Sequence, residues 1–221
     1  MSLFITGTDT GVGKTFTAAH LLRLARASGL RCAGYKPICC GDREDAELLL
    51  AASDPELTLD EVNPVWFRTP AAPFTAAVVE QRGIDVQLIH DQLARLRARF
   101  DFVVVEGVGG WLVPIRADYF ASDLAAEMRL PVLVVALNRL GCLNHTMLTV
   151  QSVAASGLPC LGVAFNEREP SADVAETTNA DILKRISPVP VLPGLTADMS
   201  DLPPEWRPIL ECQRYTKVSA T

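Results

Sequence analysis

A glycine-rich stretch reads Gly7-Thr8-Asp9-Thr10-Gly11-Val12-Gly13-Lys14-Thr15, and it follows the apolar run Leu3-Phe4-Ile5. An apolar strand, a glycine-rich bend and a helix together form a phosphate-binding loop, in which backbone N–H groups converge on anionic oxygens. Residues 16–27 are expected to form that helix. The stretch predicts a P-loop that binds a nucleotide; the alternative is an ordinary glycine-rich turn between a strand and a helix.

The end of this loop carries the residue types that nucleotide chemistry needs. Gly13 lets the backbone pass close to the phosphates, Lys14 supplies a cation to the outer phosphates, and the Thr15 hydroxyl is the usual oxygen ligand for magnesium. The strict motif has a glycine five positions before Gly13, where this chain has Thr8. The loop therefore departs from the strict motif at one position and keeps its Gly-Lys-Thr end.

The composition favours one α/β domain over residues 1–221. Hydrophobic residues make up 49% of the 221 residues, which is enough for a sizeable core. The formal net charge is −6 and no run rich in Lys and Arg occurs, which argues against a nucleic-acid surface and favours small-molecule substrates. No signal-peptide pattern or membrane-length apolar run is found, so we expect a cytoplasmic protein.

The six cysteines lack the Cys-x-x-Cys spacing of metal and redox motifs. Some of them lie in apolar runs, where buried free thiols are common. We therefore expect reduced cysteines that bind no metal. The six positions are Cys32, Cys39, Cys40, Cys142, Cys160 and Cys212.

Strand and helix patterns alternate along the chain. Strands are expected at 3–5, 31–36, 102–105, 130–137, 160–165 and 189–192, with a further short strand or extended segment at 63–67. Helices are expected at 16–27, 41–53, 85–99, 144–155 and 173–186, with a short helix after the turn at 69–73 and a short helix or coil after residue 198. This alternation predicts a single-domain α/β P-loop fold, a mainly parallel β-sheet with helices on both faces.

Three charged side chains are candidates for the site beside the P-loop. Two of them end predicted strands, and the third begins a predicted helix. Lys36 ends the second strand and points toward the ligand crevice of such sheets, although a surface lysine is the alternative. Asp45 lies in the first turn of a helix, where a carboxylate also complements the helix dipole. Glu106 ends the buried strand 102–105, the position at which P-loop hydrolases place a magnesium-binding carboxylate. A buried ionised carboxylate there needs a partner.

Two later segments also end at this edge. The helix that starts near Asn144 offers an N-terminus, which suits a carboxylate or a phosphate. His145 is a candidate general base there, but a solvated or capping residue is the favoured interpretation. Asn166 ends the strand 160–165, and its amide offers both a donor and an acceptor, which suits a purine edge or a plain turn.

Four motifs together resemble the dethiobiotin synthetase family of the biotin pathway. The P-loop is joined by Gly34-Tyr35-Lys36-Pro37, Val105-Glu106-Gly107-Val108-Gly109-Gly110-Trp111 and Leu140-Gly141-Cys142-Leu143-Asn144-His145. The resemblance spans about residues 2–195 in the family's order and spacing. Thr8 stands where the resembling enzymes also have threonine. The Leu-Gly-Cys-Leu-Asn-His segment combined with Gly-Tyr-Lys-Pro is the most specific part.

The resemblance implies an ATP- and magnesium-dependent ligase that forms C–N bonds. In such enzymes one amine of 7,8-diaminononanoate takes up CO2, ATP phosphorylates the resulting carbamate, and the second amine closes a cyclic urea. Negative charge builds up between the γ-phosphate and the carbamate, so catalysis rests on positioning and on cations. The resemblance also implies a homodimer in which each substrate site is shared across the interface.

Site residues follow from the same resemblance. Lys14, Lys36 and Thr10 are the expected catalytic residues, with Thr10 facing the carbamate. Thr15, Asp45 and Glu106 would hold magnesium. ATP contacts are expected from Asp9, Thr10, Gly11, Val12, Gly13, Lys14, Thr15, Phe16, Asn166, Pro193, Gly194 and Leu195. Substrate contacts are expected from Thr10, Lys36, Cys40, Gly141, Cys142, Leu143 and Asn144, the last four through the partner subunit.

One position departs from the family pattern, and two other classes of protein are considered. The family usually has Ser-Gly where this chain has Cys40-Gly41, and a thiol is a weaker hydrogen-bond donor than a hydroxyl. Amide-forming enzymes of the cobyrinate-synthase type share the core but usually carry a glutamine amidotransferase domain, for which 221 residues leave no room. Partitioning-type ATPases usually have an early P-loop lysine, which Thr8, Asp9 and Thr10 do not supply.

Overall fold

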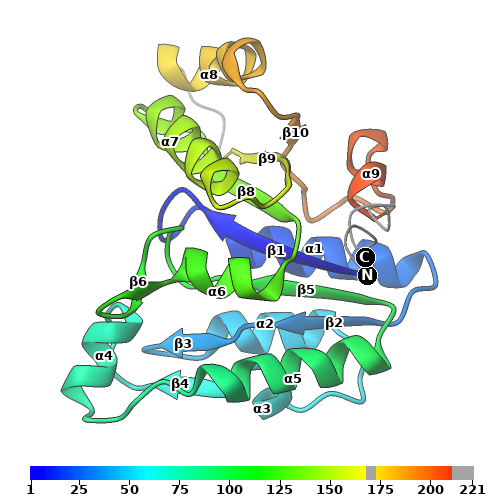
Figure 1. Ribbon diagram of the computed structural model, residues 1–221. Coiled ribbons are helices and arrows are strands. Elements are labelled where there is room, and N and C mark those ends of the chain that lie inside the picture. The colour runs from blue at the N-terminus through cyan, green and yellow to red at the C-terminus, as the bar shows by residue number, and fades with distance from the viewer. Residues whose placement is uncertain (168–172, 211–221) are drawn as a thin grey trace, which may run out of the picture.

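The computed structural model describes residues 1–167 and 173–210, and its centre is a six-stranded parallel sheet (Figure 1). The strand order is β10-β9-β8-β1-β5-β2, and every neighbouring pair is parallel. The strands are β1 Ser2–Gly7, β2 Cys32–Tyr35, β5 Phe102–Glu106, β8 Val132–Leu137, β9 Cys160–Asn166 and β10 Val191–Pro193. The predicted α/β fold class is confirmed.

The middle strands are apolar because both of their faces are covered. All residues of β1, β5 and β8 are buried, and their runs of Val, Leu and Ile suit a strand without a solvent face. Figure 1 shows α1 and α2 on one face of the sheet and α5, α6 and α7 on the other. The main helices are α1 Lys14–Ala27, α2 Glu44–Ala52, α5 Val86–Arg99, α6 Ala121–Met128, α7 Cys142–Ala155 and α8 Val174–Ile186.

Short elements complete the described part of the chain. β3 (Ile38–Cys40) and β4 (Val65–Phe67) form a small parallel sheet, and β6 (Pro114–Arg116) pairs with β7 (Tyr119–Phe120). The short helices are α3 Leu59–Val62, α4 Pro73–Val79, the 3-10 turn η1 Pro204–Trp206 and α9 Arg207–Leu210. The six main strands and five predicted helices are present, whereas β3, β6, β7, α3 and α6 were not predicted.

The strand order places a ligand edge beside β1. The chain runs outward from β1 to β2, returns to β5 on one side of β1, and then continues to β8 on the other side. Ligands of open α/β sheets bind at the carboxyl ends of the strands where the order reverses in this way. The P-loop follows β1 at that point, and Glu106 ends the neighbouring strand β5.

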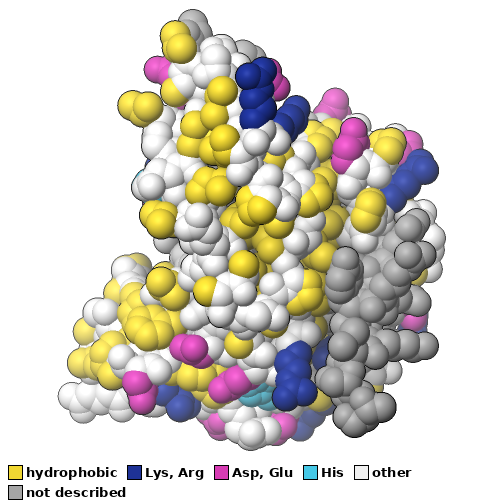
Figure 2. Space-filling view, turned by 45° about the horizontal axis from the view of Figure 1, so that its top comes forward, with side chains coloured by type: hydrophobic (Ala, Val, Ile, Leu, Met, Phe, Trp, Pro, Cys, Tyr) yellow, Lys and Arg dark blue, Asp and Glu magenta, His cyan; other side chains and the backbone are white. Residues whose placement is uncertain are grey.

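The charged side chains and the cysteines are spread over the described part of the chain. Lys and Arg side chains are scattered over the face shown in Figure 2 and form no continuous patch there. Cys32, Cys39, Cys40, Cys142 and Cys160 are free thiols, and Cys212 lies outside the described residues. Within residues 1–167 and 173–210, no helix is long and apolar enough to cross a membrane.

Candidate active site

The P-loop has the backbone geometry that its glycines predict. Gly11 and Gly13 have φ angles of 71° and 92°, in the left-handed region that favours glycine. Gly13 caps the N-terminus of α1. A Cβ atom on Gly13 would lie only 2.5 Å from the Nδ2 atom of Asn166. The loop therefore requires glycine at position 13 for its φ angle and for the close approach of Asn166.

Lys14 and Asp9 are ordered by contacts within and beside the loop. The Lys14 ammonium group donates to the Asp9 carbonyl at 2.9 Å. Burial and the neighbouring positive charge of Lys36 lower the pKa of Lys14 to about 8. The Asp9 carboxylate accepts from the Thr10 N–H at 2.8 Å and pairs with Arg139 at 2.9 Å. Lys14 and Lys36 are therefore two neighbouring positive groups, and an anion bound between them would be stabilised by both.

Four side chains from separate parts of the chain meet beside the P-loop. The Lys36 ammonium group lies 2.6 Å from Glu106 Oε1 and 2.7 Å from Asp45 Oδ2. The Thr15 hydroxyl lies 2.6 Å from Asp45 Oδ1 and 2.8 Å from Glu106 Oε1. Thr15 is on α1, Asp45 is on α2, and Glu106 ends β5. The structure thus brings together the lysine and the three oxygen-bearing residues that the sequence singles out.

The charges in this cluster depend on one another. Burial opposes ionisation of Lys36, but the Glu106 and Asp45 carboxylates raise its pKa above the usual range, so it stays protonated. Burial raises the pKa of Glu106, and the Lys36 ammonium opposes that shift. Burial also disfavours ionised Asp45, yet Lys36 and Thr15 hold its pKa below the usual range. The ammonium group of Lys36 therefore stabilises two carboxylates at once.

The same cluster fits a magnesium ion. Glu106 Oε2 is buried and has no hydrogen-bond partner among the described residues, so one carboxylate oxygen is free for a ligand. Magnesium prefers hard oxygen donors and usually binds one or two carboxylates together with water and substrate phosphates. Thr15, Asp45 and Glu106 supply such donors. In the described part of the chain, no group of three or more His, Cys, Asp and Glu side chains could hold a metal ion, so water and substrate phosphates would have to complete the coordination.

Two pockets meet at the P-loop. One, of about 820 Å³, is lined by Gly11, Val12, Gly13 and Phe16, by Asn166 at the end of β9, and by residues 191–197 around β10. The other, of about 760 Å³, is lined by Thr10, Lys14, Thr15, Lys36, Cys40, Asp45 and Glu106, together with residues 70–73. Gly11 and Gly13 border both pockets. A molecule with an apolar ring and a polyanionic tail can occupy both pockets across this loop.

Asn166 contacts the P-loop as well as the first pocket. Its Nδ2 atom donates to the carbonyls of Val12 at 3.1 Å and Gly13 at 3.3 Å, and lies 3.2 Å from the Thr17 hydroxyl. The neighbouring carbonyls fix the amide orientation, because a flipped amide would place oxygen against oxygen. The donor that the sequence suggested for a purine edge is therefore used by the loop. Oδ1 accepts from the Thr17 hydroxyl at 3.5 Å and is the side-chain atom with capacity left to contact a base.

The segment 141–144 is placed differently from the other predicted residues. It begins α7, where Gly141 is the N-cap with a φ of 88°. Among the described residues, none of these four lines either pocket. The neighbouring Leu140 is 82% exposed. Within one chain the segment is therefore not part of the P-loop site, whereas Cys40 and Thr10 are.

Two residues near the site were not singled out from the sequence. Arg139 follows β8 and pairs with the P-loop residue Asp9, and its position after a strand at the ligand edge was the available signal. Asn63 contacts the backbone of Lys36 from a turn between two short elements. No sequence pattern marks that second contact.

This fold and site define a P-loop nucleoside triphosphatase. The septum site-determining protein MinD of Pyrococcus horikoshii superposes with a TM-score of 0.54 at 19% identity, covering 87% of this chain and 82% of that chain. A ParA family ATPase of Chlorobium tepidum superposes with a TM-score of 0.52 at 11% identity, covering 89% and 85%. At these identities the likeness concerns the fold alone.

Sequence relatives identify the family within that class. A family model described as an AAA domain matches residues 1–200. The ATP-dependent dethiobiotin synthetase BioD of Akkermansia muciniphila is 44% identical over 191 residues, covering 86% of this chain and 90% of that protein. The protein of the same name from Anaeromyxobacter dehalogenans strain 2CP-C is 43% identical over 198 residues, covering 86% and 89%. The chain belongs to the ATP-dependent dethiobiotin synthetase family, a family of ligases.

Proposed function

We propose that this enzyme closes the cyclic urea of dethiobiotin from 7,8-diaminononanoate, CO2 and ATP in biotin biosynthesis. The observation that carries the proposal is the cluster of Lys36, Asp45, Glu106 and Thr15 beside the P-loop, in a chain of this family. It supplies one cation, the Lys36 ammonium group, and several oxygen donors where a terminal phosphate would lie. The dependence on ATP supports a cytoplasmic location.

Each bond change in the proposed reaction can be written out. One amine of the diamine adds to CO2 and loses a proton, which gives a carbamate. A carbamate oxygen attacks the γ-phosphorus of ATP, and the bond to the β-phosphate oxygen breaks, releasing ADP. The second amine then attacks the carbonyl carbon of the carbamoyl phosphate and loses a proton, and inorganic phosphate leaves with the carbamate oxygen as the urea ring closes.

The residues of the two pockets suit these steps. The base and ribose are assigned to the pocket at Phe16, Asn166 and residues 193–195, and the phosphates to the loop between the pockets. Lys14 and Lys36 would face the γ-phosphate from two sides and stabilise the charge that develops during transfer. Thr10 lines the second pocket and would contact the carbamate. Cys40 lines the same pocket and would lie beside the diamine.

Thr15, Asp45 and Glu106 would hold magnesium, whose charge, when bound, neutralises the phosphate oxygens during transfer. The free Oε2 atom of Glu106 supports this assignment, as does the exclusively oxygen donor set. Lys36 would then keep the two carboxylates ionised and oriented. These residues would act by positioning the substrates and stabilising charge, so the proposed reaction needs no covalent nucleophile from the protein.

We also propose a homodimer. The segment 141–144 begins α7 away from the P-loop pockets of its own chain, and Leu140 beside it is 82% exposed. The backbone N–H groups of Gly141, Cys142, Leu143 and Asn144 at this helix N-terminus suit the remote carboxylate of the diamine. A second copy would bring this segment to the substrate pocket and would cover Leu140.

The function is tested by supplying the protein with diaminononanoate, labelled bicarbonate and MgATP, with a blank that lacks the diamine. Diamine-dependent label in an acid-stable product supports the proposal. ATP hydrolysis without such a product would indicate an ATPase of another kind on the same fold.

A further inference from the structure

The backbone of Lys36 is held by a turn outside the central sheet. β2 pairs with β5 only as far as Tyr35, opposite Val105. The Lys36 N–H donates instead to the Val62 carbonyl at 2.8 Å, and the Lys36 carbonyl accepts from the Asn63 side chain at 2.8 Å. The end of α3 therefore determines where this lysine leaves the sheet.

Asn63 has a partner for each polar group of its side chain. The residue is 2% exposed. Its Nδ2 atom donates to the carbonyls of Lys36 at 2.8 Å and Val65 at 3.0 Å, and its Oδ1 atom accepts from Arg43 Nε at 3.1 Å. A flipped amide would face carbonyl oxygens with an oxygen and a guanidinium group with its NH2. The side chain therefore has a single favourable orientation, and only an amide satisfies all three contacts.

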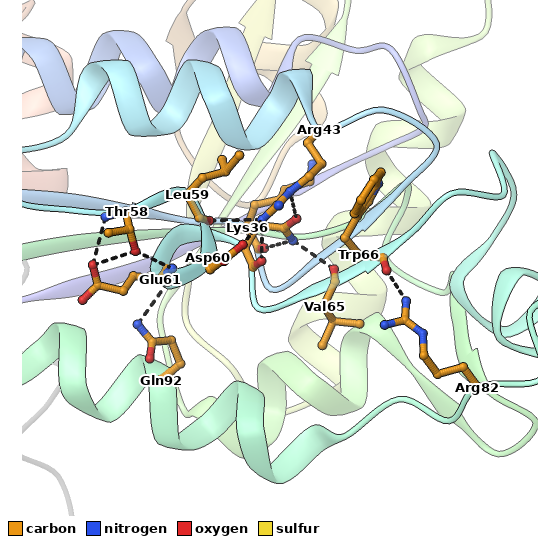
Figure 3. Close-up of polar contacts among 11 residues, drawn as sticks. Lys36, Arg43, Thr58, Leu59, Asp60, Glu61, Val65, Trp66, Arg82 and Gln92 are labelled. Atoms are coloured by element: carbon orange, nitrogen blue, oxygen red, sulfur yellow. Dashed lines mark hydrogen bonds and ion pairs between the residues drawn. The ribbon is translucent and has the colours of Figure 1, made fainter.

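Arg43 extends these contacts to the start of α2. Arg43 is the N-cap residue of α2, the helix that carries Asp45. Its Nη2 atom donates to the carbonyls of Leu59 at 3.3 Å and Asn63 at 2.9 Å, and its guanidinium lies 5.5 Å from the centre of the Trp66 ring. Figure 3 shows Arg43 and Lys36 joined to the same turn by these polar contacts. The turn at the end of α3 therefore bonds the backbone of Lys36 directly and contacts Arg43, two residues before Asp45.

We propose that Asn63 is a positioning residue for phosphoryl transfer. Its amide holds the backbone of Lys36 and, through Arg43, the N-terminus of α2, so that the ammonium group and the Asp45 carboxylate stay 2.7 Å apart. The inference rests on the proposed function, in which Lys36 acts on the transferred phosphoryl group. A displacement of about 1 Å of such a group is enough to lower turnover strongly.

Variants in the turn at the end of α3 distinguish an effect on the position of Lys36 from an effect on the stability of the protein. Asn63→Ala removes the amide, and Asn63→Ser is a milder change that keeps one donor. Thr58→Ala is the matched control, because Thr58 caps α3 and accepts from Glu61 N–H but does not touch Lys36. For each variant kcat, the KM for diamine, the Kd for MgATP and the Tm would be measured. Asn63→Ala would also be combined with Lys36→Met.

The expected result is a fall in kcat of about tenfold or more for both Asn63 variants, with the Kd for MgATP changed by less than about threefold. Thr58→Ala should lower the Tm and keep kcat within about twofold of wild type, as a purely structural change does. In the Lys36→Met background, Asn63→Ala should lower the residual rate no further, because both changes act through one group.

Two results would overturn the inference while leaving the proposed function intact. One is a folded Asn63→Ser protein with the kcat of Thr58→Ala. The other is an equal loss from Asn63→Ala with and without Lys36. A wild-type protein that makes no diamine-dependent product would instead overturn the proposed function, and with it the role of Lys36. If Asn63→Ala does not fold, Asn63→Ser decides the question, measured alone and in the Lys36→Met background.

Discussion

Lys36 and Glu106 form a buried ion pair, with the ammonium nitrogen 2.6 Å from Oε1 of a carboxylate that is 0% exposed. The other carboxylate oxygen has no hydrogen-bond partner among the described residues. One side of the carboxylate is thus neutralised by the protein, and the other is free for a ligand. The predictions below follow from this pair and from the loop beside it.

Glu106→Gln should remove the ligand function and preserve the packing. The glutamine is of equal size, and Lys36 keeps its contact with Asp45 at 2.7 Å. We expect kcat to fall by about 100-fold, as when one electrostatic group is removed from a transition state, and its magnesium dependence to shift to higher concentration. The measurement is turnover against magnesium concentration, with the Tm as control. Unchanged rate and magnesium dependence would refute the assigned role.

Gly13→Ala should abolish nucleotide binding. The added Cβ would lie 2.5 Å from Asn166 Nδ2, and the φ of 92° is strained for alanine. Gly83→Ala is the control, because nothing lies within 4 Å of its added Cβ and its φ is not in the left-handed region. Calorimetry with MgATP measures both. A Gly13→Ala protein that binds like Gly83→Ala would show that the loop adopts another conformation.

ATP binding should be coupled to protonation of Lys14. Burial and Lys36 lower the pKa of Lys14 to about 8, so at pH 8.5 the free protein carries a mostly neutral amine, and phosphates restore the charged form. Binding should therefore take up a large fraction of a proton at this pH and progressively less as the pH falls below 8. Calorimetry at pH 8.5 in buffers of different ionisation enthalpy measures the uptake. Lys14→Arg, which stays charged, should show none, and equal enthalpies for wild type in all buffers would contradict the prediction.

Asn166→Ala should weaken binding of the phosphates as well as the base. Its amide donates to the carbonyls of Val12 and Gly13 at 3.1 and 3.3 Å, so the loop loses an anchor worth about 1–3 kcal/mol. We expect the Kd for ATP to rise about tenfold or more, and the Kd for tripolyphosphate, which has no base, to rise as well. If tripolyphosphate binding is unchanged, Asn166 acts through the base alone.

Leu140→Glu should dissociate the proposed dimer. Leu140 is 82% exposed beside Gly141, and a charge in a covered apolar contact is costly. Light scattering should then show monomer, and the KM for diamine should rise while the Kd for ATP stays within about twofold, because the nucleotide contacts lie within one chain. Leu88→Glu, on the 41% exposed Leu88 of α5, is the control and should leave the mass unchanged. A dimeric Leu140→Glu protein with an unchanged KM would contradict the shared site.

Much of the fold can be predicted from the apolar runs in the sequence and from their order. The runs that form β1, β5 and β8 are continuously apolar, and such runs are typical of parallel strands covered on both faces. The alternation of strands and helices places Lys36 after β2, Asp45 on α2 and Glu106 at the end of β5, all at one edge of the sheet. The structure shows that these three side chains meet. The roles of these residues in the reaction stay predictions.

The rest of the site depends on contacts that no local pattern encodes. β3 and β4 are three-residue strands, too short to show a period. Asn63 precedes Pro64 and reads as an ordinary turn residue, yet its amide contacts Lys36, which lies 27 positions earlier. The donor of Asn166 serves Val12 and Gly13, residues more than 150 positions away. Such pairings become visible only when the chain is folded.

The most direct test of phosphoryl transfer to a carbamate follows the carbamate oxygen. The wild-type protein would be incubated briefly with diaminononanoate, MgATP and freshly dissolved bicarbonate labelled with oxygen-18, and the phosphate released would be analysed by mass spectrometry. Because the oxygen that attacks the γ-phosphorus leaves with the phosphate at ring closure, the account predicts labelled phosphate in an amount equal to the cyclic urea formed. Unlabelled phosphate, or phosphate released without diamine-dependent product, would contradict it.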